Sequence, residues 1–279
     1  MPWALVAAII HLRKASKGSA ASTRALACLS LGAAQEVTGV AKSIGANSMS
    51  PMLAPATLRV NETFLSIQGE GEFIGTPSLF IRLDGCPLRC AWCDTPYALA
   101  GDAGRDMSVE EIAALAGSHS HVVITGGEPL AQDIKPLVTA LGQRHITVET
   151  SGTIFAELPG VSLFSISPKL GSSGYTPKPA VLRKYFATAP GRMQLKFVIA
   201  DAHDLELARA LLGDLAADLP QSTPIVLQPE SGRAGDGDSY VQFLEWLTTA
   251  VLGDPAWHAY DVRVLPQLHY LLWKGVAGR

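Results

Sequence analysis

The stretch Gly85–Thr95, GCPLRCAWCDT, is the strongest indication in this 279-residue chain of both its fold and its chemistry. It holds three of the four cysteines of the chain, Cys86, Cys90 and Cys93, in the spacing C-x3-C-x2-C. Three thiolates are one ligand fewer than a cubane iron–sulfur cluster usually takes from a protein. A coordination position left open distinguishes a reactive metal site from a structural one. The spacing therefore predicts a [4Fe-4S] cluster in which one iron is free to bind another molecule.

Two other interpretations of these cysteines are open. They could hold zinc together with a histidine, or they could be three unrelated buried thiols, which are common in proteins. A zinc site usually shows a second pair of ligands at short spacing, and the remaining cysteine, Cys28, lies far upstream. Three thiols within eight residues would also be an unusual accident of packing. We therefore favour the cluster.

The bulk properties of the chain argue against several classes of protein. Its length fits one large domain or two small ones. The formal net charge of −3 gives none of the basic surface that nucleic-acid binding needs, and no apolar run reaches the length of a transmembrane helix. Three clustered cysteines do not form a disulfide framework, and a thiolate cluster needs a reducing compartment. We therefore expect a cytoplasmic protein that binds neither nucleic acid nor a membrane.

The first part of the chain differs in composition from the rest. Ala, Ser and Gly dominate from Ala15 to Ser50, which shows no sustained helix or strand period. No basic stretch precedes the short apolar patch at the start of the chain, so a signal peptide fits poorly, whereas a targeting peptide stays open. We expect translation to start at Met49 or Met52. Residues 1–56 would then be a disordered tail or a stretch translated in error, ahead of a core domain over residues 57–279.

Seven short apolar runs in the core domain predict buried parallel strands. The runs are Ser78–Leu83, His121–Thr125, Ile146–Glu149, Leu163–Ser167, Gln194–Ile199, Pro224–Gln228 and Val262–Leu265. Helical patterns separate several of them, and the first pattern begins with a capping box, Ser108-Val109-Glu110-Glu111. The other patterns cover Gln132–Arg144, Asp204–Ala217 and Ser239–Leu252. Repeated strand–helix–strand units predict an α/β fold with a parallel sheet and right-handed crossovers.

Polar and glycine-rich residues directly follow five of these strands. The segments are Asp84–Thr95, Gly126–Glu128, Thr150–Gly152, Ser167–Lys169 and Gln228–Glu230. In a (β/α) barrel these positions are the carboxyl ends of the strands, where active sites are built. We therefore expect the five segments to meet on one face. Six or seven strands are too few for a complete eightfold barrel, so the prediction is a partial, open TIM-like (β/α) barrel with parallel strands.

The run Thr125–Pro129, TGGEP, follows an apolar strand and precedes a helical pattern. Its two glycines permit close approach of a ligand, and backbone amides at a helix start can hold an anionic group. Glu128 could accept from an ammonium group, or the run could be a tight turn with Glu128 placed favourably at a helix N-terminus. Combined with the cysteine spacing, the run resembles the radical S-adenosylmethionine (SAM) superfamily, in which the open iron binds the amino and carboxylate groups of SAM.

At a finer level, residues 57–275 resemble one radical SAM family, 7-carboxy-7-deazaguanine synthase. The resemblance rests on SIQGEG at Ser66–Gly71, GTPSLFIRL at Gly75–Leu83, the ending WCDT of the cysteine motif, and TGGEP. It implies a radical SAM lyase of queuosine or 7-deazapurine biosynthesis. The implied reaction contracts the ring of 6-carboxy-5,6,7,8-tetrahydropterin to 7-carboxy-7-deazaguanine with loss of ammonia. The implied cofactors are a [4Fe-4S] cluster, SAM that is regenerated, and Mg2+.

The same resemblance implies roles for individual residues, with no catalytic side chain because the radical forms on SAM. The cluster ligands would be Cys86, Cys90 and Cys93, and the Mg2+ ligand Thr95. The substrate contacts would be Ile67, Gln68, Gly69, Glu70, Arg82 and Thr125. The SAM contacts would be Trp92, Cys93, Asp94, Gly127, Ser167, Pro168 and Lys169. The planar fork of an arginine suits a carboxylate, and an amide beside a carboxylate suits the donor–acceptor edge of a pterin.

Other interpretations of some residues stay open. Arg82 could form a surface ion pair with Asp84, and Lys169 could be solvated. Gln228 and His269, expected near the last strand ends, could line the pocket, although a structural role is the commoner one for a single histidine.

The alternative enzyme is a glycyl-radical enzyme activase, which shares the cysteine spacing and a GGEP-like turn but acts on a protein. A pterin pocket explains Gln68–Glu70 and Arg82, whereas a protein substrate does not. A zinc-binding scaffold would leave the TGGEP run unexplained. The favoured family implies a homodimer that binds a small pterin and receives electrons from a flavodoxin- or ferredoxin-type donor.

Overall fold

The computed structural model describes residues 56–232, 237–274, 276 and 278. The expectation for residues 1–56 lies outside this part except at Ala56, and it stays a prediction. Within the described residues nine strands form one sheet. The strands are β1 (Thr57–Ile67), β2 (Pro77–Leu83), β3 (Arg105–Ser108), β4 (His121–Gly126), β5 (His145–Thr150), β6 (Leu163–Ile166), β7 (Met193–Ile199), β8 (Pro224–Pro229) and β9 (Asp261–Val264).

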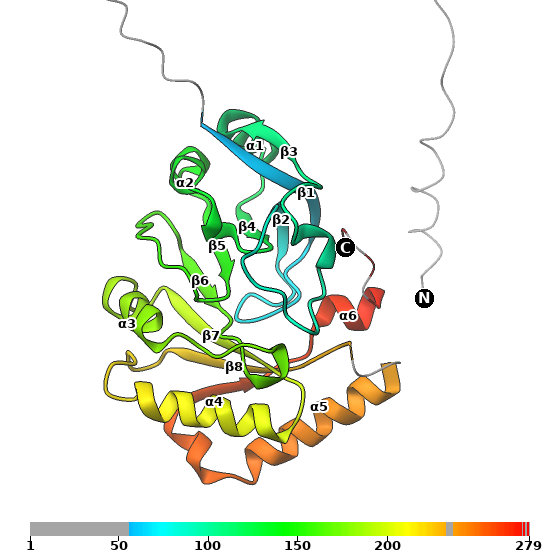
Figure 1. Ribbon diagram of the computed structural model, residues 1–279, viewed down its shortest axis with the longest axis vertical. Helices are drawn as coiled ribbons and strands as arrows, with labels where there is room; N and C mark the ends of the chain where they lie inside the picture. Colours follow the sequence, from blue (N-terminus) through cyan, green and yellow to red (C-terminus); the bar gives the residue numbers. More distant parts are fainter. Residues whose placement is uncertain (1–55, 233–236, 275, 277, 279) are drawn as a thin grey trace, which may run out of the picture. The chain divides into compact units, whose positions relative to one another are not determined.

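The parallel part of the sheet confirms the seven predicted strands. The strand order is β3-β1-β2-β4-β5-β6-β7-β8-β9, and each neighbouring pair from β2 onward is parallel. The antiparallel strands β1 and β3 extend the sheet beyond β2, and neither lies in one of the seven predicted apolar runs. Among the described strands β3 and β9 are the two edges, so the sheet is open, as predicted (Figure 1).

Helices connect most of the parallel strands. They are α1 (Val109–Leu115), α2 (Lys135–Leu141), α3 (Pro179–Thr188), α4 (Ala202–Leu215), α5 (Gly237–Leu252) and α6 (Leu268–Trp273). Short 3-10 helices are η1 (Pro96–Ala98), η2 (Pro129–Ala131), η3 (Gly171–Ser173) and η4 (Pro255–Ala259). In the described part of the chain, no helix is both long enough and apolar enough to cross a membrane.

The predicted helix ends are partly confirmed. The capping box is present, since Ser108 Oγ accepts from the Glu111 amide and the Glu111 carboxylate accepts from the Ser108 amide. Helix α2 is shorter at both ends than the predicted Gln132–Arg144, and at its C-terminal end Gly142 leaves the helical conformation with a φ of 67°, which glycine adopts readily. Helix α4 begins at Ala202, two residues before the predicted start at Asp204, and its cap is Asp201. Helix α5 begins two residues before Ser239.

The two faces of the sheet differ in chemistry, and this difference positions the site. In β7, Leu195 and Phe197 are fully buried in the apolar core, whereas Lys196 and Val198 line a central cavity. Successive side chains of a strand point to opposite faces. One face therefore packs against helices α1 to α5, which follow one another along the outside of the sheet in Figure 1, and the other face surrounds the cavity.

Candidate active site

The strands enclose a cavity of about 210 Å³ on the inner face of the sheet. All five polar segments that were predicted to meet contribute residues to its lining. The residues assigned by resemblance also line it, with the exception of Pro168. They are Ile67, Gln68, Gly69, Glu70, Arg82, Cys86, Cys90, Trp92, Cys93, Asp94, Thr95, Thr125, Gly127, Ser167 and Lys169. The fold thus brings separate regions of the sequence to one place, as expected, while the individual roles remain proposals.

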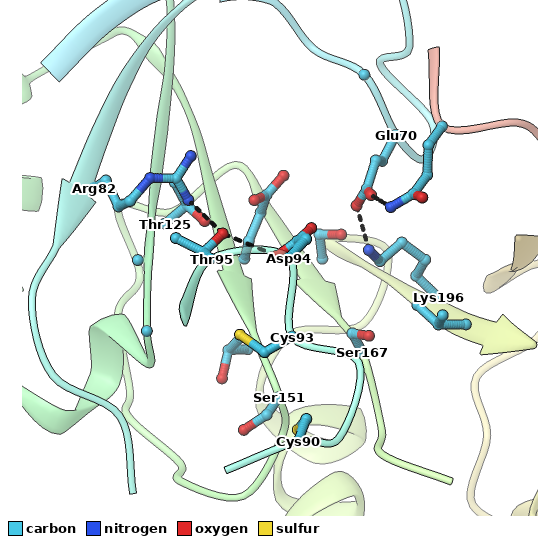
Figure 2. A pocket seen from close by; sticks show the side chains of 18 of the residues that line it. Glu70, Arg82, Cys90, Cys93, Asp94, Thr95, Thr125, Ser151, Ser167 and Lys196 are labelled. Carbon is cyan, nitrogen blue, oxygen red and sulfur yellow. Dashed lines mark hydrogen bonds and ion pairs between the residues drawn. The ribbon is translucent and has the colours of Figure 1, made fainter. Parts of the chain in front are cut away.

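The three cysteines are free thiols on the loop that follows β2, and Figure 2 shows two of them, Cys90 and Cys93, beside the cavity. The Cys93 amide donates to the Cys90 carbonyl at 3.2 Å, which makes a tight turn. Burial raises the pKa of the Cys86, Cys90 and Cys93 thiols, so iron must displace their protons when it binds. The described residues contain no further cysteine. Three sulfur donors fit a cluster with one open iron.

The TGGEP turn packs directly against the cysteine loop. A Cβ on Gly127 would lie 2.7 Å from the Cβ of Cys86 and would also meet the carbonyl oxygen of Gly85. The Glu128 amide donates to that same carbonyl at 2.9 Å. Only glycine fits at residue 127 without moving one of the two loops, so the turn and the cysteine loop hold each other in place.

Glu128 ties strand ends together and is not among the residues that line the cavity. Its carboxylate, 1% exposed, accepts from Thr150 Oγ1 at 2.7 Å, from the Ser151 amide at 2.9 Å and from the Leu130 amide at 3.3 Å. It caps η2. This is the tight-turn arrangement, and it leaves no reason to assign Glu128 to an ammonium group of a ligand.

Arg82 forms one side of the cavity. Its Nε donates to Glu62 at 2.7 Å, and its Nη1 donates to Thr95 Oγ1 at 3.4 Å. Thr95 in turn donates to Asp94 at 2.8 Å, and Figure 2 shows these three side chains in sequence. The suggested ion pair of Arg82 with Asp84 is wrong, because Asp84 pairs with an arginine of β1.

Glu70 forms another side of the cavity. Its Oε2 makes a close ion pair with Lys196 Nζ from β7, and its Oε1 accepts from the side-chain amides of Gln228 at 2.9 Å and Gln267 at 2.7 Å. The side chains of Glu70 and Lys196 are each 12% exposed. In Figure 2 this pair lies across Asp94 from Arg82. The loop after β1 is therefore anchored inside the sheet.

Opposite charges decide the protonation of this pair. Burial alone raises the pKa of Glu70, but the charges of Lys196 and His269, together with hydrogen bonds from Lys196 and Gln267, outweigh burial and lower that pKa. Burial alone lowers the pKa of Lys196, but Glu70 and Glu149 outweigh it and raise that pKa. Both groups are therefore charged at neutral pH. The pKa of Lys169 is shifted in the other direction, because burial and the charge of Lys196 lower it.

Lys169 lies in the cavity beside the cysteine loop. Its Nζ donates to Ser167 Oγ at 3.1 Å and lies 5.4 Å from the ring centroid of Trp92, which is close enough for a cation–π attraction. The Trp92 Nε1 donates to Ser172 at 2.8 Å and fixes the ring. These contacts favour the cavity position over the solvated alternative.

Sequence reasoning missed some of the lining residues. Lys196 is the one charge in the apolar run QLKFVI, and strand alternation could have placed it on the face opposite its apolar neighbours. Glu149, at the end of β5, accepts from Gln68 Nε2 at 2.9 Å. His269 lines the cavity but belongs to α6, not to a strand end. Gln228 is not among the lining residues and instead supports Glu70.

The sequence also matches a known protein family over several of the segments that form the cavity. A model described as the radical SAM superfamily matches residues 80–172, a stretch that includes the cysteine loop and the TGGEP turn. An open parallel sheet with three thiols in its central cavity defines the class of radical SAM enzymes, and the chain is one of them.

Individual relatives narrow the assignment from the radical SAM superfamily to one family within it. The 7-carboxy-7-deazaguanine synthase of Pyrobaculum aerophilum is 34% identical over 241 residues, which cover 82% of this chain and 100% of the relative. The synthase of Halobacterium salinarum is 35% identical over 243 residues, or 77% of this chain and 90% of the relative. The crystal structure of QueE from Escherichia coli superposes with a TM-score of 0.58 at 30% identity and covers 76% of this chain and 95% of its own. The chain belongs to the 7-carboxy-7-deazaguanine synthase family.

Proposed function

We propose that this protein converts 6-carboxy-5,6,7,8-tetrahydropterin to 7-carboxy-7-deazaguanine and ammonia, with a [4Fe-4S] cluster and SAM bound. The reaction balances, because substrate and product differ by one NH3. One observation carries the proposal: a single cavity joins three free cysteines to Arg82 on one side and to Glu70 on another. A carboxylated pterin has a carboxylate at one end and an amino-pyrimidinone edge at the other, so its two ends match these groups.

Each side of the cavity would bind one end of the substrate. The Nη atoms of Arg82 would hold the carboxylate. Glu70, kept ionised by Lys196, would accept from the N–H groups of the pyrimidinone edge, with Gln68 beside it. Thr125, opposite Arg82 in the β2–β4 pair, would contact the substrate from the other side. Binding at both ends fixes the reacting carbon between them, and such positioning contributes strongly to rate.

The remaining lining residues fit the cluster and SAM. Cys86, Cys90 and Cys93 would hold three of the four irons. Gly127, Ser167 and Lys169 would line the SAM site next to them. When bound, the cluster and SAM supply the one-electron chemistry that removes hydrogen from the substrate. The contribution of the protein is to orient the substrate and to keep water away from the reacting carbon.

The proposal includes Mg2+ at Thr95. Mg2+ prefers oxygen ligands and usually keeps several waters. The Thr95 hydroxyl lines the cavity and bonds to the Asp94 carboxylate at 2.8 Å, so two oxygen groups are available side by side. Thr95→Ala should abolish stimulation by Mg2+, whereas Thr95→Ser, which keeps the hydroxyl, should retain it. Equal stimulation of both variants would contradict this assignment.

The oligomeric state, the electron donor and the cellular location are also part of the proposal. By resemblance we include a homodimer, a flavodoxin- or ferredoxin-type electron donor and a cytoplasmic location. Light scattering on the cluster-loaded protein tests the dimer. Reduction of the cluster by purified flavodoxin and by purified ferredoxin, compared with dithionite, tests the donor.

The reaction itself is tested by anaerobic reconstitution of the protein with iron and sulfide. Incubation with SAM, reductant, Mg2+ and 6-carboxytetrahydropterin should give 7-carboxy-7-deazaguanine, detected by mass spectrometry. Cys90→Ala should abolish the product, and Cys28→Ala, outside the motif, should not. A protein that cleaves SAM but makes no product would refute the pterin reaction and favour the glycyl-radical activase.

A further inference from the structure

Glu62 is a charged residue beside the proposed carboxylate-binding side of the cavity to which no role has been assigned so far. It lies on β1, directly opposite Arg82 in the antiparallel pair β1–β2. It is not among the residues that line the cavity, yet it contacts Arg82, which is. Any effect of Glu62 on a bound substrate must therefore pass through that arginine.

A β-bulge puts Glu62, and not Asn61, opposite Arg82. The register pairs Val60 with Leu83 and then Glu62 with Arg82, which leaves Asn61 as the extra residue. Regular antiparallel pairing after Val60 would place Asn61 opposite Arg82. Bulges are a common way to redirect a side chain next to an active site. The carboxylate opposite Arg82 thus depends on this irregularity.

The following pair on the same face confirms which way these side chains point. Phe64 pairs with Phe80, and their rings stack with centroids 5.0 Å apart and planes 3° from parallel. Both rings line the cavity. The guanidinium carbon of Arg82 lies 5.5 Å from the Phe64 centroid. Arg82 therefore rests against an aromatic floor on the cavity face, with Glu62 beside it.

Glu62 contacts Arg82 through Nε and leaves the two Nη atoms available to a substrate. Glu62 Oε1 accepts from Nε at 2.7 Å. The outer edge of the fork, formed by Nη1 and Nη2, makes one long contact, Nη1 to Thr95 Oγ1 at 3.4 Å. A carboxylate can be bound bidentately by that outer edge. Holding Nε thus turns the outer edge toward the cavity.

Tyr97 completes the arrangement from the cysteine side. Its hydroxyl donates to Glu62 Oε1 at 2.9 Å, and its ring centroid lies 5.9 Å from the Arg82 guanidinium carbon. Tyr97 lies in η1, two residues after Thr95. Glu62 therefore links the arginine to the end of the cysteine loop.

We infer that Glu62 is a positioning residue, which holds Arg82 through Nε so that the outer edge of its guanidinium grips the carboxylate of the substrate. The inference rests on the proposed pterin reaction. The competing view is an ordinary ion pair at the edge of the cavity, since the side chains of Arg82 and Glu62 are 14% and 26% exposed. Such a pair would affect stability slightly and would not distinguish one ligand from another.

The test compares two ligands that differ in the carboxylate. Cluster-loaded protein with SAM is titrated anaerobically with 6-carboxytetrahydropterin and with tetrahydropterin, which lacks that group. Glu62→Ala should weaken binding of the carboxylated ligand about 10- to 100-fold and leave binding of the other unchanged. Glu62→Gln keeps an acceptor oxygen without the charge and should lie between Glu62→Ala and the native protein. The control is Glu206→Ala, at a glutamate whose side chain is 70% exposed.

The outcomes separate this inference from the proposed reaction. Native protein that neither prefers the carboxylated pterin nor converts it would refute the proposed reaction, and the role of Glu62 with it. The positioning role alone would be refuted if the native protein prefers and converts the carboxylated pterin, but Glu62→Ala weakens binding of neither ligand or of both ligands equally. If Glu62→Ala fails to fold or to take up iron, Glu62→Gln and Tyr97→Phe decide, because each should reduce the preference for the carboxylated ligand.

Discussion

Replacing Lys196 by methionine should destabilise the fold by about 3 kcal/mol, because it leaves Glu70 buried without its cation. Removing one partner of a buried ion pair costs about 3–5 kcal/mol. Two amide hydrogen bonds to Glu70, at 2.9 and 2.7 Å, would remain, and both side chains retain 12% exposure. These features place the expected cost at the lower end of that range.

Urea unfolding of anaerobic samples with equal iron content measures this cost. With an m-value of about 3 kcal/mol per molar urea, a loss of about 3 kcal/mol lowers the midpoint by about 1 M. The double variant Lys196→Met/Glu70→Gln removes the stranded charge as well, so it should be more stable than the sum of the single effects predicts, by about 2 kcal/mol. Additive single effects, or a midpoint shift below about 0.3 M for Lys196→Met, would show that Lys196 does not stabilise the buried charge of Glu70.

Stability should fall as the pH is lowered from about 6.5 to about 4, because burial and the nearby His145 lower the pKa of His121 from 6.5 to about 4. In this window the unfolded chain binds a proton that the folded His121 does not, which amounts to about 3 kcal/mol. His121→Gln should remove this part of the pH dependence in thermal melts of cluster-free protein. Gly127→Ala should lower the iron content and weaken SAM binding about 10-fold or more, measured by iron assay and equilibrium dialysis. Gly69→Ala should lower kcat/KM for the pterin about 10-fold in product assays, because a Cβ there would lie 3.0 Å from His269 Cβ and must displace that side chain.

Two variants serve as matched controls. His203→Gln changes a histidine whose side chain is 70% exposed, and it should leave the pH dependence unaltered. Gly213→Ala adds a Cβ that meets nothing within 4 Å, so iron content, SAM binding and turnover should be those of the native protein. A His121→Gln protein with the native pH profile, or glycine variants that behave like Gly213→Ala, would contradict these expectations.

The parallel strands could be predicted because each is an apolar run with polar residues at its ends. In β8, for example, every residue is buried, so the hydrophobic pattern alone marks the strand. Strand β1 was harder to detect because its residues are mostly partly exposed. Helix α3 was missed because it begins at Pro179 and its N-cap, Lys178, makes no side-chain cap. Where a local signal is weak, tertiary packing decides the element.

The class of chemistry follows from local sequence alone. Three thiols on one short loop, Cys86, Cys90 and Cys93, are placed by local spacing, and they imply an open cluster wherever the loop lies in the fold. Which charges meet around the cavity, in contrast, depends on the three-dimensional fold. Glu70 and Lys196 are 126 residues apart, and Glu62 faces Arg82 because a single extra residue shifts the register of β1. Contacts of this kind depend on strand order and register, and a shift of one residue changes which side chain faces the site.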